Sequence, residues 1–395
     1  MTTSGTELPQ ITTTNNQIYG SANKILYAAE QRLGGDPVQT GQVRIAAAPW
    51  TLEIYPTMAC NIACHFCNAA VRREELRFVN MPDEMMDRLH ASIAAMGVRG
   101  VQYCGGGEPT LWRNGRIADY IAALPAGITR AAMASNIVKG HHLARPDTLA
   151  RMAFLEVAVF SYDDPTYEMM AGVGGTHTRV RDSLEKILAA RAAAGLDHPF
   201  VNAKILISDR NYLWFSDIYD WVAGAGFDNI HVRLVDDYEH TGAGFVLNDA
   251  QRTEFAGIVA RYADSRGLPH LTDQLPMIVG TDNKGVGVEL NHCWTVALGM
   301  NCWVLSNGKV FACGPQWGNE DYCIGDLNHA NLEDIWGSPR HQEVAELLIA
   351  KMGSSRCFAL GCRHARQTQV IDLMRDGSVT VPPASEFTAR HAEFL

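Results

Sequence analysis

Three cysteines near the start of the chain have a spacing that suits a metal centre. Cys60, Cys64 and Cys67 lie in the segment YPTMACNIACHFC as Cys-x3-Cys-x2-Cys. A structural zinc site takes four protein ligands, and no obvious fourth ligand lies nearby. An iron–sulfur cluster held by three thiolates leaves one iron with an open coordination position, where a reacting ligand can bind. The spacing therefore predicts an iron–sulfur cluster with an open site, and zinc is the alternative.

Length, charge and cysteine content restrict the class of protein. The chain has 395 residues, a formal net charge of −10 and no run rich in lysine or arginine, so binding to nucleic acid or to an anionic membrane is disfavoured. The polar N-terminus lacks the pattern of a signal peptide, and no apolar stretch approaches the length of a membrane span. We expect a cytoplasmic protein, whose ten cysteines are ligands or reactive thiols rather than disulfides.

Alternating strand-like and helix-like segments predict how the cysteine loop is positioned. Apolar runs typical of strands occupy residues 50–55, 98–104, 128–135, 154–162, 200–208 and 229–235. Helical patterns occupy residues 82–97, 115–125, 147–155, 178–195 and 215–226. Strands that are each followed by a helix form a parallel sheet, and right-handed crossovers curl it into a barrel. We expect an α/β fold with a partial (β/α)6 TIM-like barrel, whose chemistry gathers at the C-terminal ends of the strands.

The character of the sequence changes near residue 268. A further helix is expected at 248–267, and six of the ten cysteines lie beyond about residue 285. We expect three parts: an N-terminal extension with one helix (1–49), the partial barrel (50–267), and a cysteine-bearing domain with a C-terminal tail (268–395).

The cysteine triplet and a second motif resemble those of the radical S-adenosylmethionine (radical SAM) enzymes. Phe66 supplies an aromatic residue before the last cysteine, and Gly106-Gly107-Glu108 follows the second expected strand in YCGGGEPTL. In that family the glycine–glycine–glutamate motif holds the methionyl amino group of S-adenosylmethionine (SAM). The chemistry is reasonable, because glycines permit close backbone approach and the Glu108 carboxylate can pair with an ammonium group.

Further matches to the family fall at the ends of later strands. The resemblance implies that Ser135, Asn136 and Ser161 contact the ribose or carboxylate of SAM. Lys204 is a candidate for the same carboxylate, although a surface lysine is an equal interpretation. Many relatives carry an arginine soon after the fourth strand, whereas the first one here is Arg179. The residue that holds the carboxylate is therefore left open.

The resemblance also implies a reaction and a partner. In these enzymes a [4Fe-4S] cluster binds the amino and carboxylate groups of SAM. One electron then cleaves SAM to methionine and a 5′-deoxyadenosyl radical, which takes a hydrogen atom from the substrate. The protein positions the reactants and excludes solvent. A flavodoxin- or ferredoxin-type electron donor is the expected partner.

The C-terminal cysteines resemble those of SPASM domains and of their shortened twitch form. Cys293-x14-Gly308-x4-Cys313 is similar to the opening of these domains, and Cys357-x4-Cys362 closes the set. The resemblance implies at least one auxiliary [4Fe-4S] cluster. Its first-choice ligands are Cys293, Cys313, Cys357 and Cys362.

Two more cysteines leave alternatives open in this region. Cys302 is a rival ligand, because some SPASM relatives use two cysteines before the glycine, and Cys323 is left over. Two auxiliary clusters are the alternative to one. A zinc knuckle is the alternative to iron.

The substrate class is inferred from the segment before the triplet and from the end of the sixth strand. Only 59 residues precede Cys60, which is too few for a cobalamin domain and short for a peptide-recognition domain. We therefore expect a small-molecule substrate. Candidate catalytic residues are Asp236 or Asp237 as a base or hydroxyl-binding group and Arg233 as a hydrogen-bond donor. An acidic mouth would suit an aminocyclitol or aminosugar, and a solvated loop is the alternative.

Two fates of a substrate radical stay open. An auxiliary cluster that accepts an electron gives oxidation, whereas epimerisation needs a donor such as the thiol of Cys104, Cys302 or Cys323. We expect oxidation or epimerisation of an aminocyclitol or sugar carbon of a natural-product intermediate in secondary metabolism. A peptide maturase is the alternative enzyme. An iron–sulfur scaffold or electron carrier is the alternative of another class.

Overall fold

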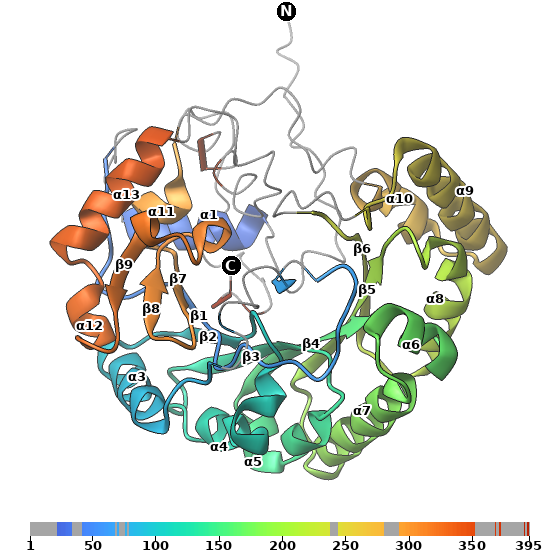
Figure 1. Cartoon of the computed structure of the whole chain (residues 1–395), viewed down its shortest axis with the longest axis horizontal. Helices are drawn as coiled ribbons and strands as arrows, with labels where there is room; N and C mark the ends of the chain where they lie inside the picture. The colour runs from blue at the N-terminus through green and yellow to red at the C-terminus, as the bar shows by residue number, and fades with distance from the viewer. Residues whose placement is uncertain are drawn as a thin grey trace, which may run out of the picture.

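A curved sheet with helices around its outer side forms the frame of the molecule (Figure 1). The structure is a computed structural model, and it describes residues 22–33, 42–67, 69–70, 76, 79–237, 244–279, 292–351, 368, 371–372, 391 and 393–394. Across the sheet the strands follow the order β6-β5-β4-β3-β2-β1-β7-β8-β9. None of the helices within the described residues has both the length and the apolar character that a membrane span requires.

Six parallel strands make up the barrel portion of the sheet. They are β1 (Thr51–Ile54), β2 (Gly100–Tyr103), β3 (Arg130–Ser135), β4 (Met152–Val159), β5 (Phe200–Ile207) and β6 (Asn229–Leu234). Each strand pairs in parallel with the next one along the chain, for example Leu52 with Val101. Within the described residues β6 and β9 stand at opposite ends of the strand order, so the sheet does not close. The predicted partial (β/α)6 barrel is confirmed.

Helices connect these strands and cover the outer face of the sheet. They are α3 (Asp83–Met96), α4 (Ile117–Ala122), α5 (Pro146–Leu149), α6 (Asp164–Ala171), α7 (Thr176–Ala193), α8 (Phe215–Gly224), α9 (Asp249–Arg266) and α10 (Pro269–Ile278). Local sequence sets their ends: the side chain of Asn248 caps the start of α9, and Gly267 ends it at φ +65°. The expected helix at 147–155 is wrong in its second half. The apolar run from Met152 is buried and forms a central strand instead.

The cysteine-rich C-terminal region continues the same sheet. β7 (Asn301–Val304) pairs in parallel with β1, and β8 (Lys309–Phe311) and β9 (Cys323–Asp326) follow it in antiparallel order. Gly308, at φ +90°, makes the turn between β7 and β8. The helices here are α11 (Trp294–Ala297), α12 (Leu332–Ile335) and α13 (Pro339–Lys351). The expected domain boundary after residue 267 falls between α9 and α10, and it stays a prediction.

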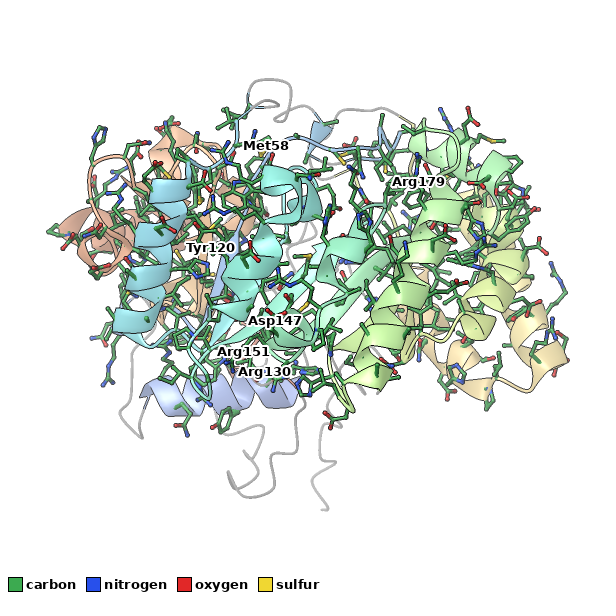
Figure 2. The ribbon with its side chains drawn as sticks, turned by 90° about the horizontal axis from the view of Figure 1, so that it is seen from below. Met58, Tyr120, Arg130, Asp147, Arg151 and Arg179 are labelled. Atoms are coloured by element: carbon green, nitrogen blue, oxygen red, sulfur yellow. The ribbon has the colours of Figure 1, made fainter. Side chains whose placement is uncertain are left out.

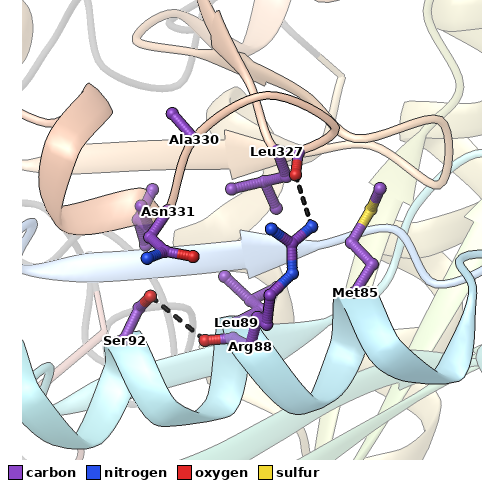
Figure 3. Close-up of a pocket in the computed structure, with 8 residues that line it drawn as sticks. Met85, Arg88, Leu89, Ser92, Leu327, Ala330 and Asn331 are labelled. Atoms are coloured by element: carbon purple, nitrogen blue, oxygen red, sulfur yellow. Dashed lines mark hydrogen bonds between the residues drawn. The ribbon is translucent and has the colours of Figure 1, made fainter.

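The helix α3 joins the barrel to this C-terminal region. Figure 3 shows Arg88 of α3 reaching the segment between β9 and α12, where its Nη2 donates to Leu327 O at 2.6 Å. Met85 and Leu89 of α3 line the same contact. The two regions are therefore held in one arrangement by side-chain packing as well as by the β1–β7 pairing.

The C-terminal end of the chain lies within the curve of the sheet, at the N-terminal ends of the strands (Figure 1). Thr51 Oγ1 donates to Glu393 O at 3.1 Å. Phe394 is fully buried and packs edge-to-face on Phe154, with ring centroids 5.1 Å apart. In α1 (Ala22–Leu33), Lys24 lies near Glu393; burial lowers the pKa of Lys24 to about 7, and Glu393 acts in the opposite direction. This end of the barrel is plugged, and no pattern in the sequence indicated it.

The plug predicts a stability effect. Replacing Phe394 by Ala removes a fully buried ring, and we expect the free energy of unfolding to fall by about 3–5 kcal/mol, as for other core Phe→Ala changes. Urea unfolding followed by circular dichroism measures this. Leu213→Ala is the control, because Leu213 is 58% exposed and its loss should change stability by less than about 0.5 kcal/mol. Equal effects of the two variants would contradict the plug.

Candidate active site

The loop after β1, residues 55–67, carries the three cysteines, and we call it the cluster loop. Backbone hydrogen bonds fix it to distant segments: Met58 N–H donates to Val79 O at 3.1 Å, and Ala63 N–H donates to Ala171 O at 2.7 Å. In Figure 2, Met58 lies at the end of the barrel opposite Arg130, the first residue of β3. The cluster loop therefore lies at the C-terminal ends of the strands, where the sequence predicts the chemistry.

The thiols of the cluster loop have surroundings that fit an iron–sulfur cluster. All three are half-buried, and Asn136 Nδ2 lies 3.8 Å from Cys60 Sγ as a donor. Donors to sulfur are among the groups that tune such clusters. Within the described residues, no group of three or more His, Cys, Asp or Glu side chains is arranged to hold a single metal ion. Phe66 is buried and packs edge-to-face on Phe160 at 5.5 Å, which anchors the loop.

The glycine run after β2 lies directly against the cluster loop. A Cβ at Gly107 would lie 2.2 Å from Ala59 O, and a Cβ at Gly106 would lie 2.2 Å from Met58 Cε. The next N–H, that of Glu108, donates to Ala59 O at 2.8 Å. Only glycine permits this backbone approach. The two predicted motifs are therefore brought together.

Glu108 is buried and is surrounded by hydrogen-bond donors. Its Oε1 accepts from Thr110 N at 3.0 Å, from Thr110 Oγ1 at 2.7 Å and from Ser135 Oγ at 2.7 Å. Its Oε2 accepts from Asn136 N at 2.8 Å. Burial raises the pKa of Glu108, and these hydrogen bonds act against the rise. A carboxylate has about four acceptor sites, so Oε2 keeps capacity for a cationic donor such as an ammonium group.

The residue after Asn136 has an uncommon backbone conformation. Ile137 is buried with φ +45°, a region that a β-branched residue rarely adopts. Such a conformation costs on the order of 1–3 kcal/mol. The turn nevertheless places Asn136 Nδ2 2.8 Å from Asn61 Oδ1 in the cluster loop. The fold therefore accepts this backbone cost at the turn that brings the end of β3 to the cluster loop.

The other predicted SAM contacts have partners within the protein. Ser161 is buried and its hydroxyl hydrogen-bonds to the hydroxyl of Thr166 at the start of α6. Lys204 Nζ lies 2.7 Å from Glu156 Oε1. Arg179 is exposed, lies at the same end of the barrel as Met58 (Figure 2), and donates to Gly174 O at 2.7 Å. Contacts of these residues with SAM stay predictions.

The inner face of the sheet carries polar residues that the sequence analysis missed. Cys104 Sγ lies 3.4 Å from Glu53 Oε2. Both Glu53 and Glu156 are 3% exposed. Burial is the largest cause that raises the pKa of the Cys104 thiol, and Glu156 adds to it. The sequence did contain a signal for this polar face, because Glu53, Glu156 and Lys204 are charged residues within largely apolar strands.

The predicted catalytic residues lie at the end of β6. Arg233 is half-buried in β6, and Asp236 and Asp237 are half-buried just after it. His231 precedes them on the same face as Arg233; burial, Lys204 and Arg233 lower its pKa well below the ordinary value. A neutral imidazole therefore lies near these residues, and the catalytic roles stay predictions.

The C-terminal cysteines that the structure describes have different surroundings. Cys293 is buried before α11, and Cys313 is half-buried after β8. Cys302 is fully buried in β7 opposite Leu52, and burial raises the pKa of its thiol. Cys323 Sγ donates to Gly325 O at 3.2 Å. Cys357 and Cys362 lie outside the described residues, so the auxiliary ligand set stays a prediction.

The close approach of Gly107 to Ala59 predicts that a larger residue at position 107 disturbs the cluster loop. In Gly107→Ala the new methyl group would meet the carbonyl of Ala59, so the loop must shift. We expect the iron content after anaerobic reconstitution to fall by about four irons per chain relative to the parent protein, which corresponds to loss of one [4Fe-4S] cluster. Gly224→Ala is the control, because a Cβ there meets nothing within 4 Å. A full iron content in Gly107→Ala would contradict the assigned contact.

Two family models match the chain. The radical SAM superfamily model covers residues 54–194, and the model of the iron–sulfur cluster-binding SPASM domain covers residues 293–363. No curated protein matches the chain.

Two solved structures illustrate the similarity of the fold. Tagged anSMEcpe with bound AdoMet is 14% identical, covers 75% of this chain and 79% of its own, and has a TM-score of 0.52. Streptococcus suis SuiB bound to the precursor peptide SuiA is 18% identical, covers 81% of this chain and 70% of its own, and has a TM-score of 0.53. At these identities the likeness concerns the fold alone.

The matched regions contain the two predicted cysteine sets. The first contains the cluster loop and the glycine–glycine–glutamate motif, and the second runs from Cys293 to beyond Cys362. These domains imply a [4Fe-4S] cluster with SAM and further iron–sulfur clusters. The chain is a radical SAM enzyme with a C-terminal SPASM domain.

Proposed function

We propose that this radical SAM enzyme acts on a small natural-product intermediate, an aminocyclitol or sugar of secondary metabolism, and oxidises or epimerises the attacked carbon. The polar inner face of the barrel is the observation that supports this most. Glu53, Glu156 and Lys204 present charged groups there, and such groups match the hydroxyl and amine groups of a cyclitol or sugar. A flavodoxin- or ferredoxin-type electron donor and a cytoplasmic location belong to the same proposal.

The residues around the cluster loop have separate tasks in this proposal. Cys60, Cys64 and Cys67 hold the catalytic cluster, and Glu108 pairs with the amino group of SAM. When bound, this cofactor supplies a 5′-deoxyadenosyl radical that abstracts a hydrogen atom from the substrate. The inner face orients the substrate, and the plug formed by Phe394 keeps water from the N-terminal end of the barrel.

Oxidation requires a group that takes a proton from the substrate. Asp236 and Asp237 are the candidates for this role. His231 is neutral near pH 7, but burial, Lys204 and Arg233 disfavour its protonated form, which makes it a weaker base than an ordinary histidine. An auxiliary cluster of the SPASM domain would supply the acceptor for the electron.

Epimerisation is the second candidate, and the position of Cys104 favours it. The thiol faces the inner side of the barrel beside Glu53, and its raised pKa keeps it as S–H near neutral pH. Cys104 gives its hydrogen atom to the substrate radical, which completes a C–H bond. The sulfur radical returns to the thiol with one electron from the flavodoxin-type donor and one proton from solvent.

Simple assays distinguish the proposed enzyme from an iron–sulfur scaffold or electron carrier and from a peptide maturase. Formation of 5′-deoxyadenosine from SAM by the reduced protein separates an enzyme from an iron–sulfur scaffold or electron carrier. A peptide maturase is the alternative enzyme, because the similar SuiB structure is bound to a precursor peptide. Turnover of aminocyclitols but not of peptides would favour the small-molecule proposal, and the reverse would overturn it.

Solvent deuterium distinguishes the two fates of the carbon. For a substrate turned over in deuterium oxide, epimerisation through Cys104 should place one deuterium on the attacked carbon, because S–H exchanges with solvent, whereas oxidation should place none. Mass spectrometry of the product measures this. Cys104→Ala should lose the deuterated epimer. A deuterated epimer formed equally by Cys104→Ala would exclude Cys104 as the donor.

A further inference from the structure

We propose that Glu156, together with Glu53, forms a subsite that binds the ammonium group of an amine-bearing substrate. The inference rests on the proposed function and deepens it, because it names the group that the substrate must carry. It also assigns a role to buried charges that the cluster loop does not use.

Glu156 has an acceptor that the described residues leave unused. Its Oε1 forms an ion pair with Lys204 Nζ at 2.7 Å. Its Oε2 is fully buried and has no hydrogen-bond partner among the described residues. A buried carboxylate oxygen without a donor is unfavourable, and a donor supplied by a ligand would relieve that cost.

Glu53 lies on the same inner face, in β1. The thiol of Cys104 contacts Glu53 at 3.4 Å and interacts electrostatically with Glu156, so Cys104 lies within electrostatic range of both carboxylates. On the inner face between β2 and β4, the strand register places Ala134 beside Glu156. Alanine is small, so β3 places no large side chain beside Glu156 at this position.

The charges near Glu156 include both signs. Lys204 pairs with Oε1 of Glu156, and the neutral imidazole of His231 lies near Lys204 and Arg233. Arg233 lies further toward the mouth of the barrel, followed by Asp236 and Asp237. One ligand ammonium would satisfy Oε2 with a charge-assisted hydrogen bond.

The surface beside Glu156 is partly accessible. Ala134, Ala158, Lys204 and His231 are half-buried, although they belong to strands whose alternate residues are fully buried. The ligand ammonium would therefore enter along this face, from the end of the barrel where the cluster loop lies. The sugar or cyclitol ring would then lie between Glu156 and the cluster loop.

Binding of 2-deoxystreptamine, a cyclitol with two amines, to the reconstituted holoprotein tests the subsite by isothermal titration calorimetry. We expect Glu156→Gln to weaken binding at least about tenfold, as for loss of a charge-assisted hydrogen bond, and Glu156→Asp to lose less. Glu185→Gln is the control, because Glu185 is exposed in α7, and it should bind like the parent. Neutral myo-inositol should bind at least about tenfold more weakly than the diamine. Iron content shows whether each variant has folded.

The outcomes separate the subsite from the proposed function. Unchanged affinity in Glu156→Gln, equal binding of myo-inositol, or no binding of the diamine would each overturn the subsite. Formation of 5′-deoxyadenosine by the parent protein and by Glu185→Gln is measured in the same preparations. If cleavage occurs without diamine binding, the subsite alone fails. If no cleavage occurs in the parent protein, the proposed function fails.

Discussion

The buried carboxylate of Glu108 is the interaction on which the arrangement of the site depends. It accepts hydrogen bonds from Thr110, from Ser135 and from the backbone of Asn136, so it ties the segment after β2 to the end of β3. Its own N–H binds Ala59 in the cluster loop. A buried carboxylate requires such donors, because desolvation disfavours its charge. Three separate loops are therefore held in one register by a single residue.

One face of the sheet packs into the hydrophobic core and the other face presents polar groups, because neighbouring residues of a strand point to opposite faces. In β4, Leu155 and Val157 pack into the core under the helices, whereas Glu156 points to the inner face. Each fully buried aliphatic side chain stabilises the fold by about 1.5–3 kcal/mol. This outer core supports the burial of charged groups inside. The plug closes the end away from the cluster loop, so the polar surface opens toward the cofactor.

Local patterns in the sequence predicted the motifs and the six barrel strands. The cysteine triplet and Gly106-Gly107-Glu108 are each contiguous, and their proximity follows from adjacent parallel strands. The sequence did not predict that β7 pairs with β1, or that Phe394 packs on Phe154, because residues distant along the chain make these contacts. The error at 147–155 arose because the apolar run there suits a helix and a buried strand equally.

The polar inner face was missed for a different reason. Glu53, Glu156 and Lys204 are visible as charges within apolar runs, but only the strand register brings Glu156 and Lys204 into an ion pair. For Lys204, the sequence left a SAM contact and a surface position as equal interpretations. In the structure Lys204 pairs with the buried carboxylate of Glu156. The sequence pointed to the carboxylates of the mouth, Asp236 and Asp237, rather than to those within the barrel.

The most direct test of the account is the affinity of the reconstituted protein for SAM in Glu108→Gln, measured by equilibrium dialysis beside the exposed control Glu185→Gln. The amide keeps an acceptor for Thr110 and Ser135 but removes the negative charge. We expect iron content to be retained and affinity for SAM to fall at least about tenfold, because an ion pair with the methionyl ammonium is lost. Parental affinity in Glu108→Gln, with full iron content, would contradict the central role of Glu108.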